Sequence, residues 1–200
     1  MGDGPDFRFE SEAPARPVCG VDEVGRGPWA GPVVTAAVIL DKATAPEGLN
    51  DSKKLSLKRR EALFEQLQAT PHAIGVASVE EIDRLNILNA TYLAMQRAIH
   101  ALPVKPGFAL IDGNRIPFDL PCPAWAIVKG DARSASIAAA SIIAKVTRDR
   151  MMAELAKEFP GYGWETNAGY GVPAHREALS RMGVTPHHRR SFRPIHNMLC

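Results

Sequence analysis

Short apolar runs alternate with polar and glycine-rich segments along this chain of 200 residues. Several of the runs are rich in β-branched residues and too short for helices, which is typical of buried β-strands. We expect strands at 18–24, 33–40, 72–79, 108–112 and 125–128. The first two are joined only by the Gly- and Pro-rich segment GRGPWAGP, and so short a connection predicts an antiparallel hairpin.

Other segments repeat their apolar residues at helical spacing. We expect helices at 56–69, 87–102, 134–159 and 173–182. Ser56 is the expected N-cap of the first, and Pro103 and Pro160 end the second and third. The pattern predicts an α/β fold, in which a hairpin-led mixed sheet is flanked by helices and followed by a helical C-terminal segment at about 160–200. Residues 1–17 are rich in Pro, Gly and charge, and we expect them to form a disordered lead before one domain at 18–200.

Composition excludes several classes of protein. No apolar run approaches the roughly 18–20 residues of a membrane-spanning helix, so we expect no membrane span. The N-terminus lacks the cationic and then apolar pattern of a secretion signal. Cysteines 19, 122 and 200 are odd in number and form no CxxC, which argues against a disulfide framework or a cysteine zinc site. We expect a reducing, cytoplasmic location.

The charge is nearly balanced overall but unevenly distributed. The chain has 24 Lys and Arg against 22 Asp and Glu. Bases nevertheless concentrate in 51–60, which includes Lys53, and in 176–193, which includes Arg189 and Arg190. Local basic patches of this kind are what binding to a phosphate backbone requires. Ordinary solvated surface charge is the alternative, for these residues and for Lys129.

Four carboxylates are the main chemical signal. Asp22 and Glu23 interrupt the first strand, Asp112 ends the fourth, and Asp131 follows the fifth. Burying a carboxylate is unfavourable unless it is paired or coordinated. Acids at adjacent strand ends therefore suggest a site for a hard cation such as Mg²⁺ or Mn²⁺, with salt bridges to Lys or Arg as the alternative. Consecutive strand residues point to opposite faces, so Asp22 and Glu23 converge only if the strand ends or bulges there.

Two glycine-rich segments offer candidate contacts to a ligand. In GRGPWAG the glycines beside Arg26 would let a ligand approach the backbone closely, although a tight turn with a surface arginine explains them too. A strand rather than a helix follows this segment, which argues against a dinucleotide or P-loop motif. In NAGYGVPAH, Tyr170 could stack on a sugar or base, or could instead cap the core.

Together these segments resemble ribonuclease HII, the type 2 RNase H family. The matching stretches are GVDEVGRGPWAGPVVTAAVIL, NDSKKLS, LIDGN, VKGDARSASIAAASIIAKVTRDRMM, NAGYGVPAH and HRRSFRPI. They follow the family order and span about residues 18–195. Only 17 residues precede the first strand, so we expect no extra N-terminal domain of the kind found in type 3 enzymes.

The resemblance implies an RNase H-like fold with a five-stranded mixed sheet. It also implies an endonuclease that cuts the RNA strand of RNA–DNA hybrids and cuts 5′ of ribonucleotides embedded in duplex DNA, leaving 3′-hydroxyl and 5′-phosphate ends. The implied cofactor is Mg²⁺ or Mn²⁺, two ions taking part in catalysis. The chain would act as a monomer, and a contact with a sliding clamp cannot be read from its sequence.

The resemblance also implies residue roles. Asp22, Glu23, Asp112 and Asp131 match the catalytic metal-binding carboxylates. Gly25, Arg26 and Gly27 match the GRG element that senses the 2′-hydroxyl, and Tyr170 matches the tyrosine that stacks on the ribonucleotide sugar. Lys53, Lys129, Arg189 and Arg190 would position phosphates without reading sequence. Two other functions stay open, a noncatalytic hybrid-binding module and an RNase H-fold nuclease that cuts only DNA. The complete set of acids argues against the first, and GRG with Tyr170 against the second.

Overall fold

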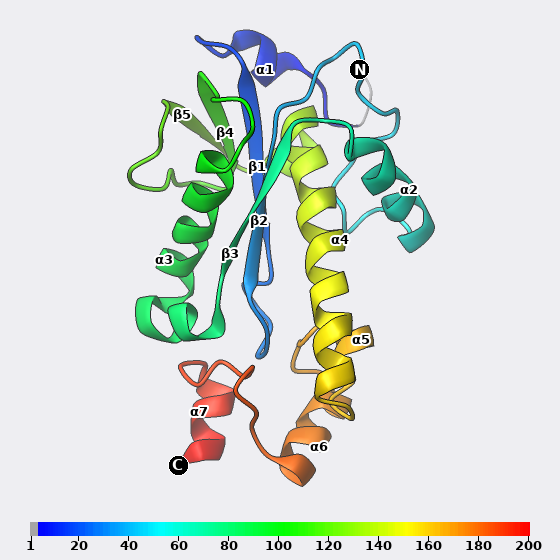
Figure 1. The fold of residues 1–200 in the computed structure, drawn as a ribbon, viewed down its shortest axis with the longest axis vertical. Coiled ribbons are helices and arrows are strands. Elements are labelled where there is room, and N and C mark those ends of the chain that lie inside the picture. The colour runs from blue at the N-terminus through cyan, green and yellow to red at the C-terminus, as the bar shows by residue number, and fades with distance from the viewer. Residues whose placement is uncertain (1–3) are drawn as a thin grey trace.

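The computed structural model describes residues 4–200 and contains one mixed β-sheet. Its strands are β1 (Val18–Val24), β2 (Val33–Val38), β3 (His72–Ala77), β4 (Phe108–Asp112) and β5 (Ala124–Ile127). They lie in the order β3-β2-β1-β4-β5 (Figure 1). β1 and β2 pair antiparallel, as their short connection predicts, whereas β1, β4 and β5 are parallel. The central position of β1 buries the strand that carries Asp22 and Glu23.

Helices cover both faces of this sheet. They are α1 (Arg8–Glu12), α2 (Leu57–Leu67), α3 (Val79–His100), α4 (Ala135–Glu158), α5 (Trp164–Asn167), α6 (Pro173–Met182) and α7 (Arg193–Leu199), with a 3-10 turn η1 at Gly130–Ala132. α3 and α4 lie on opposite sides of the sheet in Figure 1. Val21 and Ile111 pack with Ile99 of α3, while Val38 packs with Ile142 of α4. The expected α/β fold, a mixed sheet flanked by helices, is confirmed.

α3 begins earlier than the predicted 87–102. Ser78 caps it in a capping box with Glu81, so the helix starts at Val79. Asn86 then interrupts it with a left-handed backbone (φ 67°), and its side chain accepts the N–H groups of Leu88 and Asn89. The sequence pattern therefore identified the part of α3 that follows a kink and missed the short part before it.

α4 lies directly against the central strand because small residues line the contact. A side chain at Gly20 of β1 would come within 2.2 Å of the Ser136 backbone. Ala139, Ala140 and Ala144 are fully buried in the same interface. This close packing brings the buried end of β1 next to α4. Among residues 4–200, no helix has both the length and the apolar character needed to cross a membrane.

The C-terminal segment packs below the sheet in Figure 1, around the far end of α4. Its core holds Met152 of α4 together with Tyr162, Trp164, Leu179 and Ile195. Backbone hydrogen bonds tie it to the connection between β1 and β2. Trp29 donates its N–H to Gly169 O, and Arg189 donates its N–H to Trp29 O. The segment is thereby held beside the connection that contains the GRG element.

The described part of the N-terminal lead, residues 4–17, contains a helix where we expected disorder. Residues 1–3 lie outside the described residues, but α1 forms at Arg8–Glu12 and Glu10 is buried. The Glu10 carboxylate accepts hydrogen bonds from Ser134 Oγ (2.6 Å) and Ser136 N (2.8 Å) at the start of α4. A carboxylate at a helix N-terminus is stabilised by the free N–H groups there. Composition pointed to disorder because it cannot reveal this long-range partner.

Candidate active site

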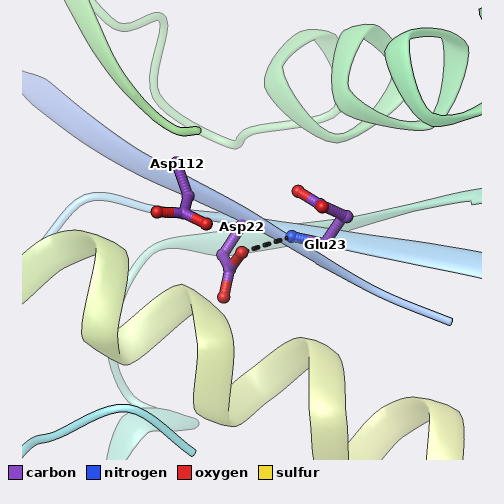
Figure 2. A group of neighbouring side chains, drawn as sticks. All are labelled: Asp22, Glu23 and Asp112. Atoms are coloured by element: carbon purple, nitrogen blue, oxygen red, sulfur yellow. Dashed lines mark hydrogen bonds between the residues drawn. The ribbon is translucent and has the colours of Figure 1, made fainter. Parts of the chain in front are cut away.

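Three of the four predicted carboxylates come together at the carboxyl ends of β1 and β4. The strands pair in parallel up to Val21 and Ile111, so Asp22 and Asp112 follow as neighbours. Asp22, Glu23 and Asp112 each offer an oxygen, and these atoms all lie within 4.8 Å of one another (Figure 2). This separation suits oxygen coordination of a cation.

Asp22 and Glu23 converge although they are consecutive in one strand. Figure 2 shows the Asp22 side chain pointing toward α4 and the Glu23 side chain leaving the opposite face, and Glu23 N donates to Asp22 Oδ1 at 2.8 Å. β4 ends at Asp112, so among residues 4–200 no strand of the sheet pairs with Glu23 on that side. The open edge beyond β4 lets carboxylates from both faces meet.

The carboxylates perturb one another. Burial raises the pKa of Asp22 well above its usual range, and the charges of Glu23 and Asp112 raise it further. Burial also raises the pKa of Glu23, against the Arg26 guanidinium, which lowers it. Within residues 4–200, Arg26 is the only Lys or Arg within salt-bridge distance of these three acids, at 3.4 Å from Glu23. The alternative in which each acid has its own basic partner does not fit this arrangement.

Asp131 lies beside the group but not within it. Its turn η1 is tied to Asp112, whose Oδ1 accepts the N–H of Gly130 at 2.6 Å. Burial raises the pKa of Asp131, and the nearby charges of Asp112 and Asp51 add to this effect, whereas Lys53 lowers the pKa. The Lys53 charge therefore acts on Asp131, and its role in binding phosphate stays a prediction. Asp51 was not predicted, and its place as the one acid in the basic segment 51–60 was the available signal.

The GRG element and Tyr170 meet beside this site. Gly25 has a left-handed backbone (φ 94°), and a side chain there would come within 2.2 Å of Arg148 Nε. A side chain built on Gly27 would contact the Tyr170 ring at 3.5 Å. Tyr170 is 43% exposed, which does not fit the alternative that it caps the core. Arg26, Gly27 and Tyr170 thus form one exposed surface.

The predicted phosphate-binding residues divide into two kinds. Lys53, Lys129 and Arg190 are exposed and can contact a backbone phosphate. Arg189 is fully buried, and its guanidinium donates to carbonyl oxygens of the β1–β2 connection, including Gly25 O and Gly31 O. The expectation that Arg189 binds phosphate directly is wrong. Basic composition located its segment but could not show which arginine faces inward.

A chain of hydrogen bonds below Tyr170 was also missed. Trp164 donates its Nε1–H to His175 Nε2 (3.1 Å), and Thr185 donates its N–H to His188 Nδ1 (3.0 Å). The two histidines meet at 3.0 Å, so His188 Nε2–H donates to His175 Nε2. His175 Nδ1–H then donates to Tyr170 O at 2.9 Å. Both imidazoles are neutral in this arrangement, which supports the Tyr170 backbone.

Comparison with known proteins shows which family the chain belongs to. The family model for ribonuclease HII matches residues 19–195. The chain belongs to the ribonuclease HII family. Ribonuclease HII of Paracoccus denitrificans is 62% identical over 200 residues, which cover 98% of this chain and 95% of that protein. The chain is accordingly a hydrolase of the RNase H class, a family of nucleases that act on RNA–DNA hybrids.

Solved structures agree with this family assignment. Ribonuclease H2 from Pyrococcus horikoshii superposes with a TM-score of 0.76 at 28% identity, over 90% of this chain and 96% of that one. RNase HII from Archaeoglobus fulgidus, solved in a complex with PCNA, gives a TM-score of 0.71 at 29% identity, over 88% and 95% of the two chains. The ribonuclease HII fold therefore extends over nearly the whole chain.

Proposed function

We propose that the chain cuts the RNA strand of RNA–DNA hybrids and also incises duplex DNA 5′ of an embedded ribonucleotide. The products would carry 3′-hydroxyl and 5′-phosphate ends. One observation carries this proposal: the convergence of Asp22, Glu23 and Asp112 beside the exposed surface of Arg26, Gly27 and Tyr170. A carboxylate cluster that can hold cations thus lies next to groups that can recognise a sugar.

The donor set fits a pair of divalent cations, Mg²⁺ or Mn²⁺. Asp22, Glu23, Asp112 and Asp131 supply only carboxylate oxygens, which hard cations prefer. Burial is the largest cause that raises the pKa of Asp22 and Glu23, and the neighbouring Asp112 charge raises both further; a bound cation would relieve this repulsion. When bound, such ions supply a more acidic attacking water and stabilisation of the leaving oxygen.

The remaining residues position the substrate. Lys53, near Asp131, and the exposed Lys129 and Arg190 would bind phosphates of the duplex. Tyr170 offers a ring to the ribonucleotide sugar, while the backbone of Gly25, Arg26 and Gly27 would test its 2′-hydroxyl. The 2′-hydroxyl is the group that distinguishes RNA from DNA at a single nucleotide.

Neither alternative function explains this arrangement as well. A noncatalytic hybrid-binding module has no use for carboxylates that repel one another without a cation. A nuclease restricted to DNA has no use for an exposed aromatic ring beside a glycine-lined backbone. A contact between this chain and a sliding clamp stays a prediction. The Archaeoglobus relative was solved in a complex with PCNA. The monomeric state of this chain stays a prediction as well.

Comparison of three matched duplexes tests the proposal. One is a continuous RNA–DNA hybrid, one is DNA with a single ribonucleotide, and one is DNA alone. We expect cleavage of the first two with Mg²⁺ or Mn²⁺, loss of cleavage with EDTA, and no cleavage of the third. Equal cleavage of the all-DNA duplex would contradict the proposal, and cleavage of the hybrid alone would remove its second part.

A further inference from the structure

Two fully buried arginines hold the loop formed by residues 25–32, which contains the GRG element. Arg189 reaches it from the C-terminal segment. Its guanidinium donates to Gly25 O at 2.5 Å, Arg26 O at 3.0 Å, Gly31 O at 2.9 Å and Pro32 O at 3.2 Å. A single side chain thus binds carbonyls at both ends of the loop.

Arg148 reaches the same loop from α4. It donates to Pro32 O at 2.9 Å and Ala30 O at 3.0 Å, and its third contact is Ala168 O at 2.8 Å. Ala168 lies two residues before Tyr170. Arg148 therefore connects the GRG loop to the loop that carries the stacking tyrosine.

Among the described residues, neither guanidinium has an acidic partner. Within residues 4–200, no carboxylate lies at salt-bridge distance from Arg148 or Arg189. Burial lowers the pKa of both side chains, and their mutual repulsion lowers that of Arg189 further. Burying two like charges in this way is unfavourable. Carbonyl dipoles are their compensation, so the charges constrain the direction in which the loop carbonyls point.

The direction of the loop carbonyls determines where the backbone N–H groups of the loop point. The Gly25–Arg26 and Arg26–Gly27 peptides are trans, so each N–H points away from the carbonyl of its own peptide. Arg189 binds the carbonyls of Gly25 and Arg26 on the inner side. The N–H groups of Arg26 and Gly27 consequently point outward, and among residues 4–200 neither donates to a backbone carbonyl.

We propose that Arg189 and Arg148 are positioning residues for ribonucleotide recognition. They hold the GRG carbonyls inward, which aims the N–H groups of Arg26 and Gly27 at the 2′-hydroxyl oxygen of the substrate. Arg148 also keeps the Tyr170 loop in register with these donors. This inference rests on the proposed function and deepens it, because it assigns ribose selectivity to two side chains that never touch the substrate.

The test compares selectivity rather than activity alone. Arg189→Lys keeps the charge but cannot donate to four carbonyls, and Arg189→Met removes the charge as well. Arg148→Lys tests the contacts that the second buried arginine makes to the loop. The matched control is Arg150→Lys, because Arg150 is an exposed arginine of the same helix that pairs with Glu61 and Glu65. For each protein, kcat/KM is measured on DNA with one ribonucleotide and on the continuous hybrid, together with affinity for all-DNA duplex.

We expect Arg189→Lys and Arg148→Lys to lower the ratio of the two kcat/KM values about tenfold or more, as misplacement of positioning groups does. Affinity for plain DNA should stay within about twofold of the wild type, because the phosphate-binding residues are untouched. Arg150→Lys should match the wild type. Arg189→Met should lose more than Arg189→Lys.

Equal losses on both substrates, in variants with wild-type circular dichroism, would overturn the proposal in favour of a general structural role. So would an unchanged ratio, or lysine variants that fail to fold. Failure of the proposed function would give a different result. A wild-type enzyme that cuts the hybrid but does not cut at the single ribonucleotide would show that failure without any variant.

Discussion

Gly130 donates its backbone N–H to the carboxylate of Asp112 at 2.6 Å, which ties the last residue of β4 to the turn that carries Asp131. A side chain at position 130 would come within 2.6 Å of Ile137 Cδ1 and 3.1 Å of Asp112 Oδ1. Gly130→Ala should therefore displace Asp112 and lower cleavage about tenfold or more. Duplex binding should be unchanged. Rates and binding isotherms measured side by side check this, and full activity in the variant would show that the Asp112 position is not critical.

Removing one charge from the carboxylate group should stabilise the metal-free protein. The pKa of Asp22 is raised in the folded state, so its ionised form opposes folding at neutral pH. Asp22→Asn should raise the melting temperature by roughly 2–4 °C for each kcal/mol of repulsion relieved. The same variant should lose cleavage.

The change in melting temperature on adding a divalent metal supplies the control for Asp22→Asn. Mn²⁺ should raise the melting temperature of the wild type, because it binds the folded state, and should do so less at acidic pH, where protons compete for the carboxylates. Asp22→Asn should lose most of this increase. A wild-type melting temperature that does not respond to Mn²⁺ or Mg²⁺ would contradict the cation site.

The linked histidines His175 and His188 should make the protein less stable in acid. Burial is the largest cause that lowers the pKa of His188 to about 4, with the neighbouring His175 and His187 adding to it, and burial also lowers that of His175. An unfolded histidine titrates near 6.5. The unfolded state therefore binds protons first, and stability present above about pH 6.5 is lost as the pH falls toward 4.

Melting temperatures between pH 4 and 8 measure this effect. Relative to the wild type, His188→Gln should flatten the loss on the acid side, whereas His196→Gln, which changes an exposed histidine, should not. The Asp22 carboxylate has the opposite pH trend, which is common to all three proteins and cancels in the comparison. An identical acid profile for His188→Gln would show that the pair does not titrate in this range.

Much of the molecule could be predicted from its residues. The expected bounds of β1, β4 and α6 match the structure, because the spacing of apolar residues and the flanking Gly and Pro residues indicate the same ends there. Asp22 and Asp112 could be placed together because each interrupts or ends a buried apolar strand. Arg148 was missed, although its spacing from Ala144 and Met152, four residues on either side, places it on the buried side of α4.

Other features depend on contacts between distant segments. The burial of Arg189 depends on carbonyls more than 150 residues away in the chain, and α1 depends on the Glu10 contact with the start of α4. The meeting of Asp22 and Glu23 depends on where the neighbouring strand stops. The residues near each position in the sequence do not encode these long-range contacts. The family resemblance nevertheless indicated that Asp22 and Glu23 belong to one site.

Arg190 gives a test of the phosphate contacts. Its side chain is exposed, and its backbone N–H is held by Asp83 at 3.0 Å. Arg190→Gln should weaken hybrid and plain duplex binding alike and should reduce the slope of log affinity against log salt by about one. Salt titrations of both duplexes check this. A loss confined to the ribonucleotide substrate would instead assign Arg190 to sugar recognition.

The central claim is that this carboxylate site cuts at a ribonucleotide that Tyr170 and the GRG backbone select. The most direct measurement maps the cleavage of duplex DNA with one ribonucleotide, comparing the wild type with Tyr170→Phe and Tyr170→Ala. We predict a single incision 5′ of the ribonucleotide, leaving 3′-hydroxyl and 5′-phosphate ends. Tyr170→Ala should be slower by about one to two orders of magnitude, because stacking is worth about 1–3 kcal/mol. The loss on continuous hybrid should be smaller. Incision elsewhere, or a Tyr170→Ala variant with the wild-type ratio of rates on the two substrates, would contradict the account.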